Sequence, residues 1–292
     1  MEWLNTLADW ISARENRLPI GEWSKTAVGW LTTNFEGFFD GITAGLRFVL
    51  EGTVDILAAM PALLLILILT GIAYFLQRSW KLSLFTFFGL LLILNFDLWK
   101  EAVETLSLVL YSTLVSLLIG VPIGIIAARR PTFYQMISPV LDLMQTMPTF
   151  VYLVPVLIFF GLGPVPGLIA SVIFVVPAPI RLTYLGISQV QKPLVEAGES
   201  FGCTRWQLLV KVKLPAAMPT IMAGVNQTIM LSLSMVVIAA LVGARGLGAP
   251  IMRALAQRNV PLSVEAGLAI VVLAIVLDRT LKQRRISRSS KK

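Results

Sequence analysis

The sequence predicts an all-α integral membrane protein with about seven membrane-spanning helices. Of its 292 residues, 57% are hydrophobic and only 14% are charged, and the mean hydropathy is +0.82. Long stretches without a charged residue recur along the chain, and a hydrocarbon core about 30 Å thick needs roughly 20 apolar residues in helical form. Because lipid offers the backbone no hydrogen-bond partners, we expect these stretches to be helices.

The first part of the chain, residues 1–52, differs from the rest and is expected to be an extracytoplasmic or interfacial amphipathic segment. Glu2 and Asp9 lie where a cleaved signal peptide would carry basic and then purely apolar residues, so these residues are expected to remain in the mature protein. Apolar side chains recur at helical spacing, which favours a helix lying on the outer face, at Trp3, Leu4, Leu7, Trp10 and Ile11.

The membrane-spanning core is expected over residues 53–277. Glycines 120 and 124 would let a neighbouring helix approach closely. The charge-free run from 142 to 181 is too long for one helix and is interrupted at 161–167 by glycines and prolines, so it predicts two spans. The other spans are expected at residues 56–77, 82–96, 105–128, 214–244 and 260–277.

The net charge of +8 comes from 24 Lys and Arg against 16 Asp and Glu. The basic residues lie between and after the apolar runs, which favours a topology signal over a nucleic-acid-binding surface. Their distribution predicts an N-terminus outside and a C-terminus inside the cell. The basic tail, residues 278–292, is expected to contact anionic lipid.

One cysteine, Cys203, excludes an internal disulfide, and the absence of histidine disfavours a metal site.

One inside segment, residues 182–215, carries most of the functional information. Pro193 can begin a short helix that Gly202 ends. Thr204 and Gln207 form a T-x-x-Q capping box for a second helix. A helix–turn–helix of this kind suits docking of a soluble partner, and an amphipathic loop resting on lipid headgroups is the alternative.

The spacing of this segment resembles the EAA loop of permease subunits of bacterial ATP-binding-cassette importers. Glu196, Ala197 and Gly198 are followed by Gly202 and then by Val212-Lys-Leu214-Pro215, in the register of E-A-A-x-x-x-G and I-x-L-P. Gly198 and Val212 depart conservatively from that pattern. The likeness extends from about residue 107 to 248. Within this part, the sequence resembles the permeases of glycine betaine, proline betaine and choline importers in four stretches: TMPTFVYLVP (146–155), FFGLG (159–163), PAPIR (177–181) and ALVGARGLG (240–248).

The resemblance implies a transport subunit of the bacterial inner membrane rather than an enzyme. It implies that Glu196, Ala197, Gly198, Gly202, Leu214 and Pro215 couple the chain to a separate cytoplasmic ATPase. That partner would bind ATP and Mg, and this chain, which has no phosphate-binding loop, would bind no cofactor. It also implies a second permease copy and an extracytoplasmic substrate-binding protein docked near residues 161–167 and 245–260.

Polar residues in the sixth span are candidates for the translocation path because polar side chains are costly in lipid. Hydrogen bonding between helices is the competing explanation for these residues, Asn226, Gln227, Thr228, Ser232 and Ser234. Asp142 is expected to face water or cap a helix. A secondary transporter driven by an ion gradient and a non-transporting scaffold remain alternative functions, and the first would need no ATPase.

Overall fold

A computed structural model describes residue 3 and residues 19–281, and this part of the chain is helical with no strand. The predicted helix over residues 1–11 and the tail from residue 282 therefore lie outside the described residues, apart from Trp3. The chain divides into two units, residues 1–43 and 44–292. In the first unit, α2 (Ile20–Asn34) exposes Trp23 and Trp30, and the Trp30 ring meets Phe35 edge-on.

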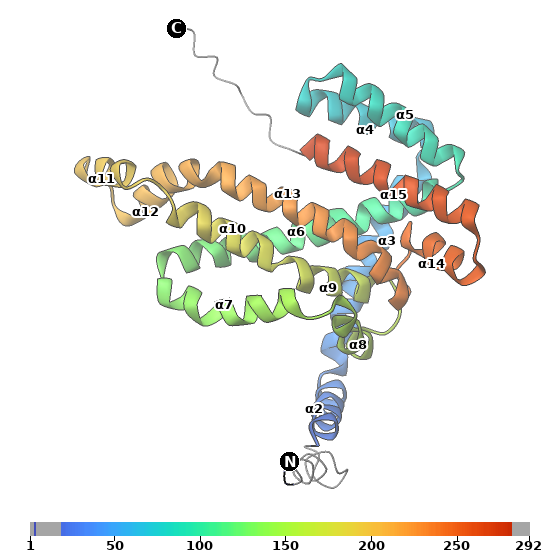
Figure 1. Cartoon of the computed structure of the whole chain (residues 1–292), viewed down its shortest axis with the longest axis horizontal. Coiled ribbons are helices and arrows are strands. Elements are labelled where there is room, and N and C mark those ends of the chain that lie inside the picture. The colour runs from blue at the N-terminus through green and yellow to red at the C-terminus, as the bar shows by residue number, and fades with distance from the viewer. Residues whose placement is uncertain (1–2, 4–18, 282–292) are drawn as a thin grey trace. The chain divides into compact units, whose positions relative to one another are not determined.

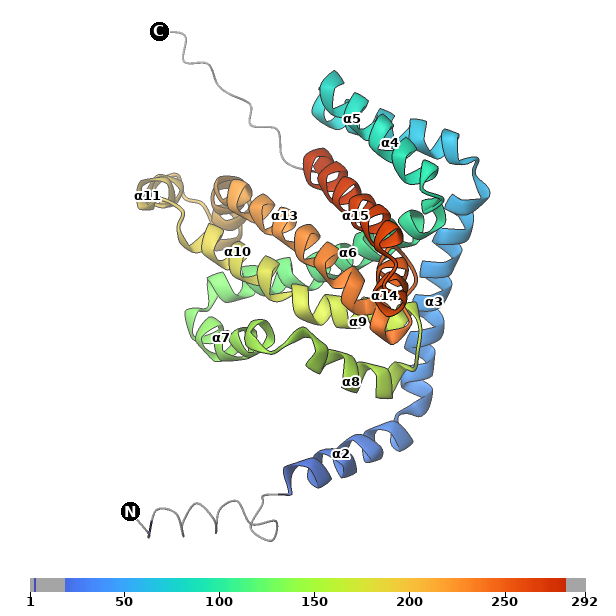
Figure 2. The ribbon, with the colours of Figure 1, turned by 45° about the vertical axis from the view of Figure 1, so that its right-hand side comes forward.

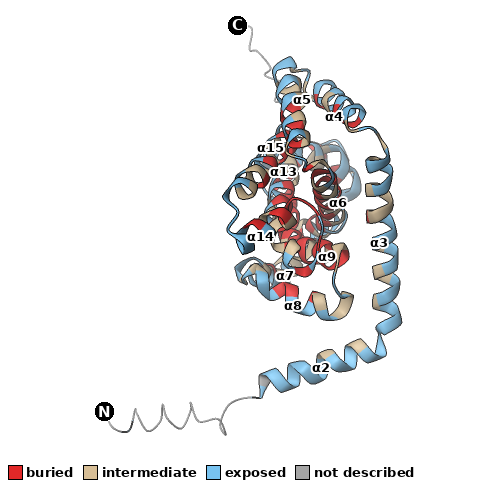
Figure 3. Cartoon of the chain, turned by 90° about the vertical axis from the view of Figure 1, so that its right-hand side faces the viewer, coloured by how far each residue is buried: buried red, intermediate tan, exposed pale blue. Residues whose placement is uncertain are grey.

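The second unit is a helical bundle centred on α6 (Trp99–Arg129), which is among its longest helices (Figure 1). The helix α10 (Pro177–Ser188) packs between α6 and α13 (Leu214–Ala239), and α13 also contacts α9 (Pro164–Val175) and α15 (Val260–Leu281). Buried residues concentrate on α6, α9, α13 and α15 (Figure 3).

A helical hairpin of α4 (Ala62–Gln77) and α5 (Trp80–Asn95) packs against α15 (Figure 2). Ser79 caps α5 by accepting a hydrogen bond from the Leu82 backbone N–H. Apolar side chains cover the outer face of α4, where Phe75 is 78% exposed, as expected for a surface in contact with lipid. The hairpin confirms a helix in the predicted second span.

Four described helical runs are long and apolar enough to cross a membrane, and two bent pairs bring the number to six. The four runs match the predicted third, fifth, sixth and seventh spans: Trp99–Arg129, Pro164–Ser188, Arg205–Val242 and Val260–Leu281. The short helix α5 occupies the second. The expected all-α membrane bundle is therefore confirmed, with differences in two spans.

The predicted first span, 56–77, is not one straight helix. It is divided between α3 (Glu36–Ala59) and α4, which meet at an angle of 106°. Pro61 has no backbone N–H to donate, and a proline disfavours helical backbone at the residue before it, here Met60. The boundary expected between residues 52 and 53 also lies inside α3.

The predicted fourth span is likewise bent, because α7 (Pro131–Thr146) and α8 (Thr149–Phe160) meet at 98°. Met147 is extended, with ψ at 136°, and Pro148 follows it. The same proline effect explains the break.

The turn after α8 is shorter than expected, since it ends at Gly163 and Pro164 already begins α9. Likewise α10 continues to Ser188, past the expected loop start at residue 182.

The predicted close approach at Gly120 and Gly124 is confirmed, with α10 as the neighbour. A Cβ on Gly124 would lie 2.6 Å from Thr183 Cβ and 2.7 Å from the carbonyl oxygen of Ile180. A Cβ on Gly120 would lie 2.6 Å from Pro179 Cγ. Only glycine permits this spacing, which holds α10 against α6 and fixes where the segment after α10 begins.

Candidate functional site

The coupling segment, defined here as residues 189–213, projects from the ends of α10 and α13 (Figure 1). Its first helix, α11 (Lys192–Ser200), has Pro193 in its first turn, as predicted. Gly202 then takes a left-handed conformation with φ at +75°. The backbone N–H groups of Gly202 and Cys203 donate to the carbonyls of Glu199 and Gly198 at 2.9 and 3.1 Å. Gly202 thus ends α11 in a tight turn that favours glycine.

The second limb of the segment starts at the predicted capping box. The Thr204 hydroxyl accepts from the Gln207 backbone N–H, and the Gln207 side chain accepts from the Thr204 N–H. The short helix α12 (Arg205–Leu208) continues through a π-helical turn, Leu209–Lys213, into α13. The π-helical turn therefore connects α12 directly to the membrane-spanning helix α13, so a displacement of the coupling segment would be transmitted to α13.

Gly198 joins the two limbs of the coupling segment. It is buried, and a Cβ at this position would lie 2.7 Å from Leu208 Cδ1 and 3.3 Å from Val212 Cγ2. The glycine that departs from the E-A-A pattern therefore lies at a close contact between α11 and side-chain ends of the following limb. Glu196 and Ala197, its neighbours in the motif, are both exposed.

The free end of the segment exposes apolar side chains that a soluble domain would normally bury. Phe201 is 89% exposed and Trp206 is 63% exposed, and Leu194 is also exposed. Together with the exposed carboxylate of Glu196 they form a surface with apolar and charged parts. Exposed aromatic residues of this kind are typical of docking surfaces.

Four of the five polar candidates of α13 divide between a buried and an exposed face. Thr228 and Ser232 are buried: Thr228 donates to the Gly224 carbonyl at 2.8 Å, and Ser232 accepts from Thr113 of α6 at 3.5 Å. Gln227 and Ser234 are exposed and share a face with Met230, which is 57% exposed. Asn226 is half-buried, and its Oδ1 has no hydrogen-bond partner among the described residues. The three exposed residues, Gln227, Met230 and Ser234, are called the α13 stripe below.

At the other end of the bundle from α11 (Figure 1), the turn before α9 and the turn that leads from α13 toward α14 (Gly248–Gln257) are neighbours. The Gly163 N–H donates to the Val242 carbonyl at 3.0 Å, which joins the turn before α9 to the turn after α13. The Leu247 N–H donates to the Thr105 hydroxyl at 2.8 Å, which fastens the same loop to α6. The two regions expected to meet the binding protein are thus neighbours.

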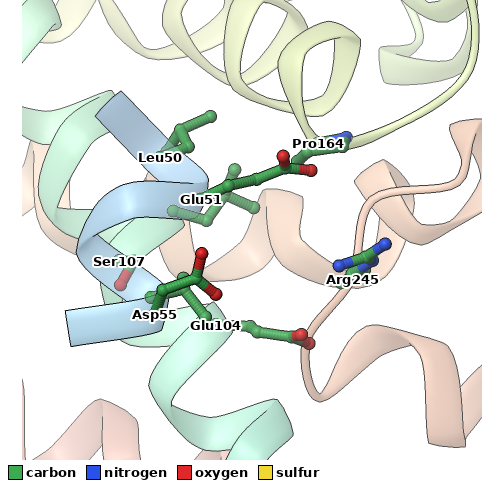
Figure 4. A pocket seen from close by; sticks show the side chains of 9 residues that line it. Leu50, Glu51, Asp55, Glu104, Ser107, Pro164 and Arg245 are labelled. Atoms are coloured by element: carbon green, nitrogen blue, oxygen red, sulfur yellow. The ribbon is translucent and has the colours of Figure 1, made fainter. Parts of the chain in front are cut away.

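A hollow of about 270 Å³ opens beside these loops (Figure 4). Three carboxylates surround it, from Glu51 and Asp55 of α3 and Glu104 of α6, together with the guanidinium of Arg245. Sequence reasoning missed this group because its members come from three distant segments and no local pattern links them.

Sequence reasoning also missed how α7 is held against α10. Asp142 accepts a hydrogen bond from the Arg181 guanidinium, with 2.6 Å between oxygen and nitrogen. The rings of Tyr134 and Tyr184 stack at a centroid distance of 3.5 Å. Asp142 is more than half exposed, as expected, but it is also ion-paired. This carboxylate is therefore a poor candidate for a free proton carrier.

Comparison with known proteins gives close relatives along nearly the whole chain. The glycine betaine transport system permease protein OpuAB of Bacillus subtilis is 48% identical over 94% of this chain and 97% of its own length. The glycine betaine/carnitine transport permease protein GbuB of Listeria monocytogenes is 47% identical, over 90% and 94% respectively. The glycine betaine/proline betaine transport system permease protein ProW of Escherichia coli is 44% identical, over 90% and 74%.

The fold is also similar to a solved structure. A chain of the MetNI methionine ABC transporter, in an inward-facing conformation, matches with a TM-score of 0.55 at 21% identity, over 60% of this chain and 89% of its own. Residues 120–282 match the family described as binding-protein-dependent transport system inner membrane component. The chain therefore belongs to this family of ABC importer permeases, as a multi-pass transport subunit of the membrane.

Proposed function

We propose that this chain translocates glycine betaine, proline betaine or a choline-like osmoprotectant across the bacterial inner membrane. The names of the relatives at 44 to 48% identity support this substrate class. The single structural observation that carries a transport role is the coupling segment. Its turn at Gly202 and its packed Gly198 give a defined shape to an exposed docking surface.

Energy for transport is proposed to come from a separate cytoplasmic ATPase, which would bind ATP and Mg. The exposed surface around Glu196, Phe201 and Trp206 would dock on that partner. Closure of the ATPases would then move α11 as a rigid body and displace α13, since the two are joined through helical turns. In this account Leu214 and Pro215, at the start of α13, receive the motion.

The α13 stripe is proposed to face the translocation path, between this chain and a second copy of it. In a single chain Gln227 and Ser234 are exposed, and an amide facing hydrocarbon would be left without a hydrogen-bond partner. A watery path between two copies would satisfy it. Thr228 and Ser232 need no such path, because they have hydrogen-bond partners inside the bundle.

Gln227→Leu is expected to lower substrate uptake several-fold while leaving the thermal stability of the chain unchanged, because it removes a path-facing amide and no internal bond. Thr228→Val is the matched control. It removes a buried hydrogen bond worth about 1 kcal/mol, so it should lower stability and preserve uptake per folded chain. Uptake and detergent thermal melts would be measured for both. Normal uptake by Gln227→Leu would remove this residue from the path.

The proposed orientation has the N-terminus outside and the C-terminus in the cytoplasm. It is supported by Arg129 and Arg130 at the C-terminal end of α6 and by the basic residues of the coupling segment, which would then all lie inside. A reporter active only in the cytoplasm is expected to give signal after Lys292 and none before Glu2. Signal at both ends would mean that one of the spans has been counted incorrectly.

The opposite end of the bundle is proposed to meet a separate substrate-binding protein, over the joined loops at Gly163 and Arg245. Substrate choice is tested by reconstituting the permease with its ATPase in liposomes and adding loaded binding protein. We expect ATP-dependent uptake of labelled glycine betaine. Unlabelled choline or proline betaine should reduce this uptake, and unlabelled methionine should not. Uptake of methionine instead would contradict the substrate class.

A further inference from the structure

A second hollow, of about 740 Å³, lies behind the coupling segment at the same end of the bundle. It is bounded by the last residues of α6, by α10 and by both limbs of the segment. This basic hollow is lined by Ile126, Ala128, Arg129, Arg130, Ile187, Glu199, Arg205, Leu208, Leu209 and Lys213.

The lining of the basic hollow is strongly unbalanced in charge. Four cationic side chains, Arg129, Arg130, Arg205 and Lys213, face it together with one carboxylate, Glu199. The ion pairs found among residues 19–281 are Arg181 with Asp142 and Arg279 with Asp278, so neither involves any of these four. Four like charges in one hollow repel one another unless an anion lies among them.

The floor of the basic hollow is apolar. Ile187, Leu208 and Leu209 are buried there, and Ile126 lies at the end of the membrane-spanning helix α6. A ligand that fits must therefore be anionic on one side and apolar on the other. Free inorganic phosphate meets only the first requirement, whereas a phospholipid with an anionic headgroup meets both.

The location also favours a lipid over the ATPase. The hollow is lined by the last residues of α6 and by Ile187 near the end of α10, and the ends of membrane-spanning helices are where headgroups are expected. The exposed aromatic surface proposed for the ATPase is on the free end of the segment, at Phe201 and Trp206, and neither residue lines the hollow.

We propose that the basic hollow binds the phosphate of an anionic phospholipid, such as phosphatidylglycerol, with part of an acyl chain on the apolar floor. The proposal rests on the proposed function only for placing this end of the bundle in the cytoplasm. A lipid bound there would touch α6, α10 and the coupling segment together.

The test is native mass spectrometry of the full chain in detergent, titrated with phosphatidylglycerol or phosphatidylcholine. The wild-type chain is expected to retain phosphatidylglycerol preferentially. Arg129→Gln with Arg130→Gln should weaken that binding roughly 30-fold, or about 2 kcal/mol at ~1.4 kcal/mol per tenfold change. The matched control, Arg78→Gln with Lys81→Gln, removes the same charge outside the hollow and should bind as the wild type does.

A single change, Arg205→Gln, should weaken binding about fivefold and serves as a second variant if the double one is unstable. Equal retention of phosphatidylglycerol by wild type and hollow variants would overturn the proposal. Displacement by equimolar inorganic phosphate would assign the site to free phosphate instead. If the hollow variants keep the lipid but no longer co-purify with the ATPase, the hollow is a contact for that protein and not a lipid site. Because lipid retention is read without ATP or uptake, its failure is separate from a failure of the transport function.

Discussion

Replacing Gly202 with valine is expected to lower ATP-driven uptake roughly tenfold or more, without reducing the amount of chain in the membrane. The backbone at Gly202 has φ at +75°, and a β-branched side chain is strained there by about 1 to 2 kcal/mol or more. Nothing lies within 4 Å of a Cβ at this position, so the strain would come from the backbone and not from a clash. The turn would relax and change the direction of α11 relative to α13.

Two further variants separate backbone strain from charge. Gly202→Asn is the control that tolerates left-handed backbone, and it is expected to keep most of the uptake. Gly202→Asp has nearly the same shape with a negative charge at the docking surface, and it is expected to uncouple ATP hydrolysis from uptake. Membrane amount, hydrolysis and uptake would be measured in parallel. Normal uptake by the valine and aspartate variants would show that this turn has no part in coupling.

Gly124→Leu is expected to destabilise the bundle strongly. The side chain would start 2.7 Å from the Ile180 carbonyl oxygen, a backbone atom that cannot move unless α10 moves as a whole. Overpacking a tight contact typically costs about 1 to 3 kcal/mol, and a displaced helix pair costs more. The expected result is loss of the folded peak in size-exclusion chromatography after mild heating.

The matched control for Gly124→Leu is Gly71→Leu in α4. Gly71 is also a mid-helix glycine, but nothing lies within 4 Å of a Cβ there. Since the same side chain is added in the same kind of backbone, only the helix contact differs. Equal stability of the two variants would contradict the close packing of α6 on α10 as the basis of the fold.

The coupling segment could be predicted in detail because its signals are local. A proline in the first turn of α11, a glycine at a left-handed turn and a capping box all act within a few residues. The structure confirms each of these at Pro193, Gly202 and Thr204. What the spacing did not reveal was the role of Gly198, since its contact with Leu208 depends on how two limbs fold together.

Hydropathy alone predicted membrane segments and missed two of their bends. At Pro61 and Pro148 the sequence carried a local signal, but the apolar character of the surrounding residues continues through both breaks. The pair of Asp142 with Arg181 spans 39 residues, and the two charged hollows each collect residues from at least three segments. Contacts of that kind follow from packing, which no periodicity encodes.

The division of the α13 candidates was predictable only in part. Helical spacing places Gln227, Met230 and Ser234 on one face and Thr228 and Ser232 on another. Which face is buried depends on the packing of α6 and α10 around α13. The competing explanations for the polar residues, path lining and hydrogen bonding, therefore apply to different members of the set. Thr228 and Ser232 bond within the bundle, and the α13 stripe stays a proposal for the path.

The central claim is that this chain works as the permease of an ATP-driven importer. The most direct measurement is gentle purification of the tagged chain from its native membrane, with identification of co-purifying chains and an assay of ATP hydrolysis. A stoichiometric ATPase whose hydrolysis rises with loaded binding protein is the predicted result. A chain that purifies alone and carries substrate down an ion gradient without ATP would contradict the account and support a secondary transporter.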